Sequence, residues 1–222
     1  MQRLLQLVEI AMEIDSSGKR ERGPQKRAER TRRNVLEATL RLIARSGLGA
    51  VRFRAVSDEA GVSLGVITYH FPNRRDLLSA AFALHLEQSD EEASAFTELL
   101  GVAWKAGEVS LDDATDGVVR LLSSFVHDDR DSFIAGHELT LELTRDPSLV
   151  SSVQDSLSAH HRIVSALVEQ VGSTVPEPDA EILSAAFQGL ALKWLAHPDD
   201  PEFEERLRLV VRRMLEKFLG SF

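Results

Sequence analysis

The chain has 222 residues, of which 43% are hydrophobic, 6% are aromatic and none is cysteine. The lack of cysteine excludes disulfides, thiolate metal sites and thiol-based redox sensing. No run of about 18 apolar residues predicts a membrane-spanning helix, and Met1–Ile14 carries two glutamates and no small-residue cleavage site. We therefore expect a cytoplasmic protein.

Charge is distributed unevenly along the chain. Residues 1–75 hold 15 Lys and Arg against 8 Asp and Glu, whereas residues 76–222 hold 11 against 27. This asymmetry predicts an N-terminal part that binds a polyanion, although a basic solvated tail would give the same count.

The helical pattern begins at Lys26. Residues 15–25 have no apolar periodicity and predict a flexible basic arm, so we treat residues 1–25 as an N-terminal extension. Apolar residues then recur at steps of three and four as far as Gly47. Two short helices are predicted next, over 53–60 and 64–70, with Ser63 as the N-cap of the second. Asn73 caps a long fourth helix that ends near Lys105.

The rest of the chain has the same helical character. Helices are expected at 111–127, 131–145, 148–171, 178–196 and 202–219, separated by glycine, proline and acidic segments. No strand-like alternation is evident. The predicted fold is all-α, with a three-helix domain over 26–75 and a larger helical domain over 76–222.

The segment 53–71 has the pattern of a helix-turn-helix. Gly61 lies between the two short helices, where a residue that tolerates positive φ is needed. Small Ser57 allows close approach of the two helices, which Val56 and Ile67 help to pack together. The second helix then presents short or planar side chains suited to a major groove, namely Leu64, Gly65, Thr68 and Tyr69.

Basic residues surround this unit. Their natural role is phosphate contact, which gives affinity and register, although each one alone could equally be a solvated helix face. The cluster comprises Lys26, Arg27, Arg30, Arg32, Arg33, Arg52, Arg54, Arg74 and Arg75. Together with the helix-turn-helix it indicates binding of double-stranded DNA.

The stretch Arg30–Leu78 resembles the TetR family of bacterial regulators. The resemblance is carried by Ala60-Gly-Val-Ser-Leu-Gly65 followed by Tyr69-His-Phe71 and a basic residue. It implies a regulator, most simply a repressor, with a C-terminal effector-binding and dimerisation domain and no enzymatic activity. It also implies that Arg74 takes the position of a phosphate-binding lysine and that His70 and Phe71 close the motif by packing.

Three positions depart from the family pattern. Val51-Arg52 replaces the usual Ser/Thr cap, Ser57 replaces the customary alanine, and Thr68 replaces a tyrosine that contacts the DNA backbone. Arg52 or Tyr69 is a candidate to replace that contact. The residues we expect at the DNA are Arg52, Arg54, Ser63, Leu64, Gly65, Thr68, Tyr69, His70 and Arg74.

Helices 148–171 and 178–196 are, by resemblance, the candidates for a homodimer interface. The second has a large apolar face and a separate face of small residues, and two apolar faces require two partners. Full burial within one subunit is the alternative. The expected interface residues are Leu157, Ile163, Leu167, Ala185, Gly189, Leu192 and Ala196. A two-fold dimer predicts a roughly palindromic operator.

A small-molecule effector is expected among the middle helices, again by resemblance. Candidate wall residues are Phe96, Trp104, Phe125, Phe133, His137 and Leu141, each of which would also suit ordinary core packing. Spaced clusters of His and carboxylate are scarce, so neither a metal site nor a cofactor is expected.

Other functions remain open at this level. An enzyme is disfavoured because no Gly-rich phosphate loop, nucleophile elbow or His-Glu-x-x-His pattern occurs. An activator, a regulator controlled by a partner protein, and a helical dimer with a vestigial DNA-binding domain are each compatible with the sequence.

Overall fold

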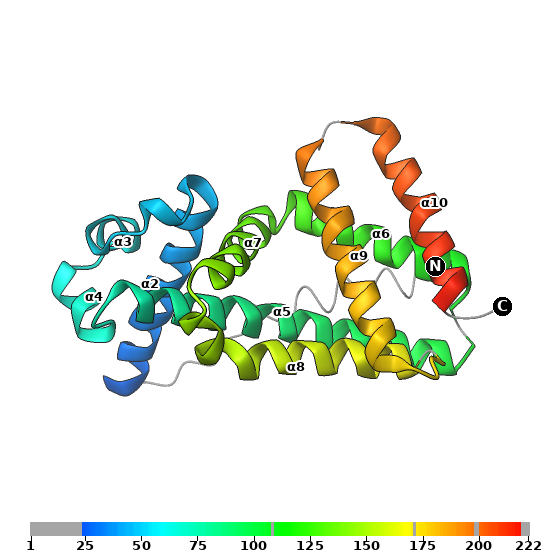
Figure 1. Ribbon diagram of the computed structural model, residues 1–222, viewed down its shortest axis with the longest axis horizontal. Helices are drawn as coiled ribbons and strands as arrows, with labels where there is room; N and C mark the ends of the chain where they lie inside the picture. The colour runs from blue at the N-terminus through cyan, green and yellow to red at the C-terminus, as the bar shows by residue number, and fades with distance from the viewer. Residues whose placement is uncertain (1–23, 108, 171, 198–199, 219–222) are drawn as a thin grey trace. The chain divides into compact units, whose positions relative to one another are not determined.

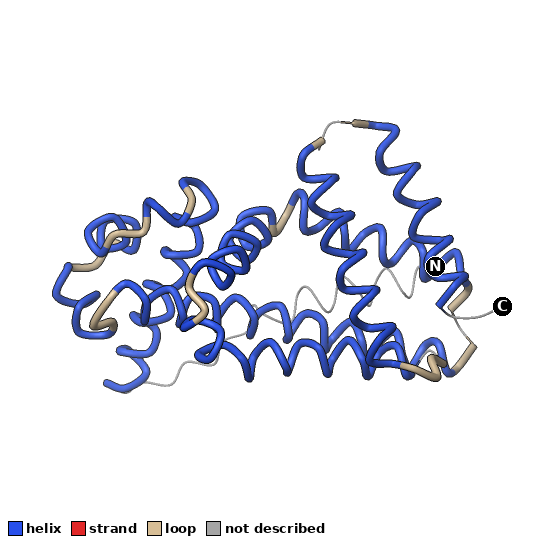
Figure 2. Tube along the Cα trace, viewed as in Figure 1, coloured by secondary structure: helices blue, strands red, loops and turns tan. Residues whose placement is uncertain are grey.

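The computed structural model describes residues 24–107, 109–170, 172–197 and 200–218. Every regular element in these ranges is a helix, as Figure 2 shows, which confirms the all-α prediction. No helix within the same ranges is long and apolar enough to cross a membrane.

The helices follow the predicted order closely (Figure 1). Helix α2 begins at Pro24, two residues inside the predicted extension, with proline at a helix start where its missing N–H costs nothing. The elements are α2 (Pro24–Ser46), η2 (Leu48–Ala50), α3 (Phe53–Ala60), α4 (Leu64–His70), α5 (Arg74–Lys105), α6 (Leu111–His127), α7 (Arg130–Arg145), α8 (Ser148–Gln170), α9 (Pro176–Ala196) and α10 (Pro201–Phe218).

The described residues form two compact units. The first unit comprises residues 24–88 and 131–157, and the second comprises 89–130 and 158–218. This division differs from the boundaries expected at 26–75 and 76–222, because residues 131–157 join the same unit as α2, α3 and α4. The predicted boundaries themselves stay a prediction.

The core of the first unit surrounds α2 and the start of α5. Apolar side chains at the predicted three- and four-residue steps are fully buried, among them Val35 and Ile43 on α2 and Leu77 on α5. Residues of α7 and α8 join the same core through Leu139 and Val153. The helix-turn-helix therefore rests on a continuous apolar base.

The second unit packs α6 against α9 and α10. Its α6 begins with a capping box in which Ser110 and Asp113 each bond the other's backbone N–H. Hydrogen bonds donated by the Ser110 hydroxyl and by its backbone N–H lower the pKa of the Asp113 carboxyl. Ion pairs from Arg208 to Asp116 and from Arg212 to Asp112 join α10 to α6.

Candidate nucleic-acid interface

The turn between α3 and α4 has the geometry that the sequence predicts. Gly61 adopts φ 66° and ψ 32°, the left-handed conformation that glycine reaches without steric cost. The Ser57 hydroxyl donates a hydrogen bond of 2.6 Å to the Val62 carbonyl, and the Val62 N–H returns one of 3.1 Å to the Ser57 carbonyl. The serine thus does more than allow close approach, because its side chain ties α3 to Val62 within the turn.

Three side chains of α2 hold α3 in place. The Asn34 amide donates to the Ala60 carbonyl at 2.9 Å, which satisfies an acceptor at the end of α3. Glu59 accepts from Arg41 at 3.1 Å and also pairs with Arg45. The hydrogen bond from Arg41, which has the largest effect, and the one from Arg45 hold the pKa of the Glu59 carboxyl below its usual range. Sequence reasoning missed these contacts, since their partners lie 14 to 26 residues apart.

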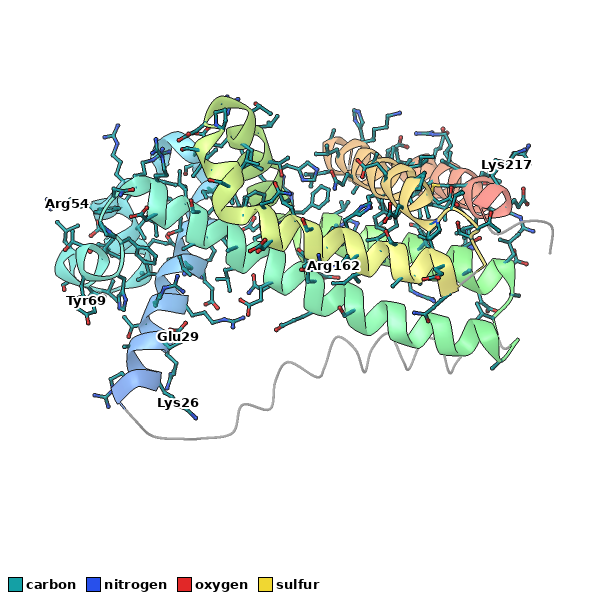
Figure 3. The ribbon with its side chains drawn as sticks, turned by 60° about the horizontal axis from the view of Figure 1, so that its bottom comes forward. Lys26, Glu29, Arg54, Tyr69, Arg162 and Lys217 are labelled. Atoms are coloured by element: carbon teal, nitrogen blue, oxygen red, sulfur yellow. The ribbon has the colours of Figure 1, made fainter. Side chains whose placement is uncertain are left out.

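Helix α4 presents the predicted reading face to solvent. The Tyr69 side chain is 82% exposed and Leu64 is 47% exposed, whereas Ile67 on the opposite face is fully buried. Figure 3 shows Tyr69 and Arg54 projecting away from the ribbon. Single exposed apolar residues are common, but an exposed leucine and an exposed tyrosine on the same seven-residue helix suit a contact surface.

Small residues at the start of α4 leave room at its surface. A Cβ added to Gly65 would meet only the Ser63 hydroxyl oxygen, at 3.8 Å. Ser63 occupies the N-cap position as predicted, but its side chain makes no cap hydrogen bond. The Thr68 hydroxyl donates back to the carbonyls of Leu64 and Gly65 at 3.3 and 3.2 Å.

The basic cluster divides into paired and unpaired residues. Ion pairs engage Arg32 with Glu29 and Arg33 with Glu37, both on α2. Four guanidinium groups have neither an ion-pair nor a hydrogen-bond partner within the described ranges and are exposed; they belong to Arg27, Arg30, Arg52 and Arg54. These four can meet phosphates without breaking an existing contact.

Arg74 and His70 are placed differently from the other expected DNA contacts. The Arg74 guanidinium donates to the carbonyls of Val51 at 3.0 Å and Leu48 at 2.7 Å, in the connection between α2 and α3. The His70 ring packs edge-on against Tyr69 at 5.0 Å and tilted against Phe71 at 6.2 Å, as a packing residue would. Arg74 as a phosphate contact therefore stays a prediction that the geometry does not favour.

The expected effector residues fall in different units. Phe133, His137 and Leu141 follow one another at four-residue steps on α7 of the first unit, with the Phe133 and His137 rings 4.3 Å apart. Phe125 belongs to the second unit, where its ring meets Phe187 edge-on at 6.2 Å. The side chains of Phe96 and Trp104 lie outside the described part of the structure. No cluster of metal-ligating side chains occurs among the residues that the structure describes.

The two faces predicted for α9 are both present. On its large face Trp194 is buried in the second unit, where it packs against His127 and Phe203, while Leu183, Phe187 and Leu190 are half-buried. Its other face is exposed to solvent and consists of Ile182, Ala185, Gly189, Leu192 and Ala196. We call these five residues the α9 stripe.

The candidate interface residues of α8 are less exposed. Ile163 and Leu167 are half-buried. Leu157 packs against the core of the first unit within a single chain, so we leave it out of the proposed interface.

Comparisons with known proteins decide the family. Residues 35–81 match the family described as bacterial regulatory proteins, tetR family, and residues 109–217 match the tetracyclin repressor-like C-terminal domain. The chain belongs to the TetR family. It is accordingly a helix-turn-helix transcriptional regulator, and a member of a family that is not enzymatic.

Individual TetR relatives resemble the chain over different lengths. The transcriptional regulator CymR of Pseudomonas putida is 28% identical over 184 residues, covering 80% of this chain and 86% of CymR. The transcriptional repressor KstR of Rhodococcus jostii is 39% identical over 59 residues, 27% of this chain and 28% of KstR. Among solved structures, the multidrug binding protein EbrR in complex with proflavin has a TM-score of 0.54 at 27% identity, covering 83% of this chain and 99% of EbrR.

Proposed function

We propose that this TetR regulator is a repressor that binds a roughly palindromic operator as a homodimer and releases it when a small molecule binds. The observation that supports DNA reading most strongly is the exposed face of α4 on a left-handed Gly61 turn, beside unpaired arginines. The repressor role is supported by KstR, which is described as a repressor. A regulator of bacterial DNA acts in the cytoplasm.

The α9 stripe supports the homodimer. Leu192 is 42% exposed and Ile182 is 52% exposed, and a Cβ added at Gly189 would meet nothing within 4 Å in its own chain. An apolar face with a glycine at its centre suits close packing of a second copy. A C2 dimer would set the two α4 helices about 34–36 Å apart or a multiple of that spacing, to match successive major grooves.

The dimer is tested by Leu192→Glu with Leu209→Glu as the matched control. Both replace an exposed leucine on a helix of the second unit, but Leu209 lies on α10, outside the stripe. We expect only Leu192→Glu to give a monomer in light scattering, with weakened DNA binding. A dimer unaffected by Leu192→Glu would contradict the stripe as the interface.

His137 supports a small-molecule effector and indicates its chemistry. Its Nδ1 lies 3.0 Å from the Phe133 carbonyl oxygen, and because a carbonyl only accepts, Nδ1 carries the proton. In the neutral ring Nε2 is then an acceptor, and it is buried without a hydrogen-bond partner within the described ranges. An unpaired buried acceptor beside an aromatic ring favours a flat or apolar ligand with one N–H or O–H donor. The multidrug binding of EbrR is consistent with such a ligand.

The effector proposal is tested in two steps. A compound library is first screened for ligands that raise the melting temperature of the protein, since a ligand of the native state stabilises it. Each ligand is then titrated against the protein–DNA complex, and we expect it to weaken DNA binding. His137→Leu should abolish the temperature shift for donor-bearing ligands. A ligand that binds at this site but leaves DNA affinity unchanged would contradict the release mechanism.

A further inference from the structure

The first turn of α5 carries two adjacent arginines with different partners. Arg74 donates from Nε to the Val51 carbonyl at 3.0 Å and from a terminal nitrogen to the Leu48 carbonyl at 2.7 Å. Arg75 donates from Nε to the Asp146 carboxylate at 3.1 Å, at the junction of α7 and α8. Both sets of contacts lie within the first unit.

The two carbonyls that Arg74 contacts belong to the segment that leads into α3. Leu48 lies in η2, and Val51 follows it, one residue before the N-cap position of α3. Both side chains are buried, but the segment is connected to α2 through Gly47, which has φ 71°. A planar guanidinium can donate two hydrogen bonds in a fixed fork, so one side chain fixes two points of this connection at once.

We propose that Arg74 is a positioning residue for DNA recognition: it holds the η2–α3 connection against the start of α5 and so sets the angle at which α3 and α4 meet DNA. Its effect on DNA affinity acts through the position of α3, because its donors point to the protein's own carbonyls. The family resemblance instead implies that Arg74 contacts a DNA phosphate, as a lysine does at this position. The positioning role and the phosphate-contact role predict different behaviour of the protein without DNA.

The fork also predicts the result of the conservative substitution. A lysine keeps the positive charge and could still meet a phosphate, but its ammonium is a point charge that cannot make the same planar pair of bonds. Arg74→Lys therefore distinguishes a positioning role from a phosphate contact. Because lysine also keeps the aliphatic part of the side chain, the variant is expected to fold. Arg75→Ala is the matched control, since it removes an arginine from the same turn without touching either carbonyl.

The experiment combines hydrogen exchange without DNA and binding to a duplex that the wild-type protein has selected from a random-sequence pool. We expect amides of residues 48–60 to exchange about tenfold faster in Arg74→Lys and Arg74→Ala, since hydrogen bonds from a charged donor contribute free energy of that order. In the Arg74 variants, amides of α6 and α10 should exchange at the wild-type rate. In Arg75→Ala, amides of residues 48–60 should also exchange at the wild-type rate. Both Arg74 variants should bind the selected duplex more weakly by a similar factor.

Three results would overturn the proposal. One is wild-type exchange of residues 48–60 in Arg74→Lys. A second is a pair of observations: Arg74→Lys binds DNA with wild-type affinity, and the slope of log K against log [salt] for Arg74→Ala is shallower than that of the wild type by about 0.9. That change in slope is the one expected for the loss of one phosphate contact. Faster exchange with unchanged affinity would also refute it, because the brace would then have no part in recognition.

Discussion

Replacing Gly65 by alanine should stabilise the free protein and weaken its binding to DNA. Gly65 lies in the first turn of α4, and its φ is outside the left-handed region that only the four glycines at 47, 61, 107 and 172 adopt among the described residues. An added Cβ would meet a single neighbouring atom, the Ser63 hydroxyl oxygen at 3.8 Å, which is ordinary van der Waals contact. The helix should therefore gain about 0.5–1 kcal/mol from the lower backbone entropy of the unfolded chain.

The cost of the same methyl group appears only in the complex. If glycine is retained because DNA approaches the α4 backbone closely, the methyl group must displace the DNA, and we expect a loss of about tenfold in affinity, near 1.4 kcal/mol. Urea unfolding of the free protein measures the first effect, and fluorescence anisotropy with a selected DNA duplex measures the second. Leu209→Glu, on α10 of the second unit, is the control and should leave DNA affinity unchanged. Unchanged affinity of Gly65→Ala, or a loss of stability, would refute this account of α4.

Three further substitutions test the packing and charge around the motif. Gly61→Ala should lower the free energy of unfolding by about 1–2 kcal/mol, because alanine is strained at φ 66°; equal stability in urea unfolding would show that the turn adapts. Gly136→Ala should cost about 1–3 kcal/mol, because its Cβ would overlap the ring of His85, and a melting temperature at or above that of the wild type would contradict this close packing. The stability advantage of wild type over Glu59→Gln should be complete above the unfolded-state pKa near 4.5 and fall as pH drops through the lowered folded-state pKa. Urea midpoints measured across that range check the sign, and an advantage that grows in acid would exclude the ion pairs as its source.

The helices were predictable because their ends carry strong local signals. Gly47, Gly61 and Asn73 mark boundaries that the structure places within a residue, since each acts through its own backbone conformation or cap. The exposed face of α4 was also predictable from the local sequence. Ile67 is the one large apolar side chain of α4 that points inward, so the opposite face is left to solvent.

The missed features depend on direction or on distant pairing. A resemblance places Arg74 at a family position but does not tell which way its guanidinium turns, and here it turns to the chain's own carbonyls. Ser57 stands where the family usually has alanine. Its hydrogen bond to the Val62 carbonyl forms only because the left-handed turn brings the two residues together, so the sequence around Ser57 did not reveal it. Glu59 pairs with arginines 14 and 18 residues away, a separation at which helix periodicity gives no register between α2 and α3.

We propose that this chain reads a specific DNA sequence through α4 as a two-fold dimer. Selection from a random pool of double-stranded DNA tests it most directly, with the wild-type protein and with Tyr69→Ala, which alters the most exposed side chain of α4. We expect the wild type to enrich two inverted half-sites with centres one helical turn or a multiple apart, and Tyr69→Ala to weaken or change the enriched half-site. Failure of the wild type to enrich any sequence, or identical enrichment by Tyr69→Ala, would contradict it.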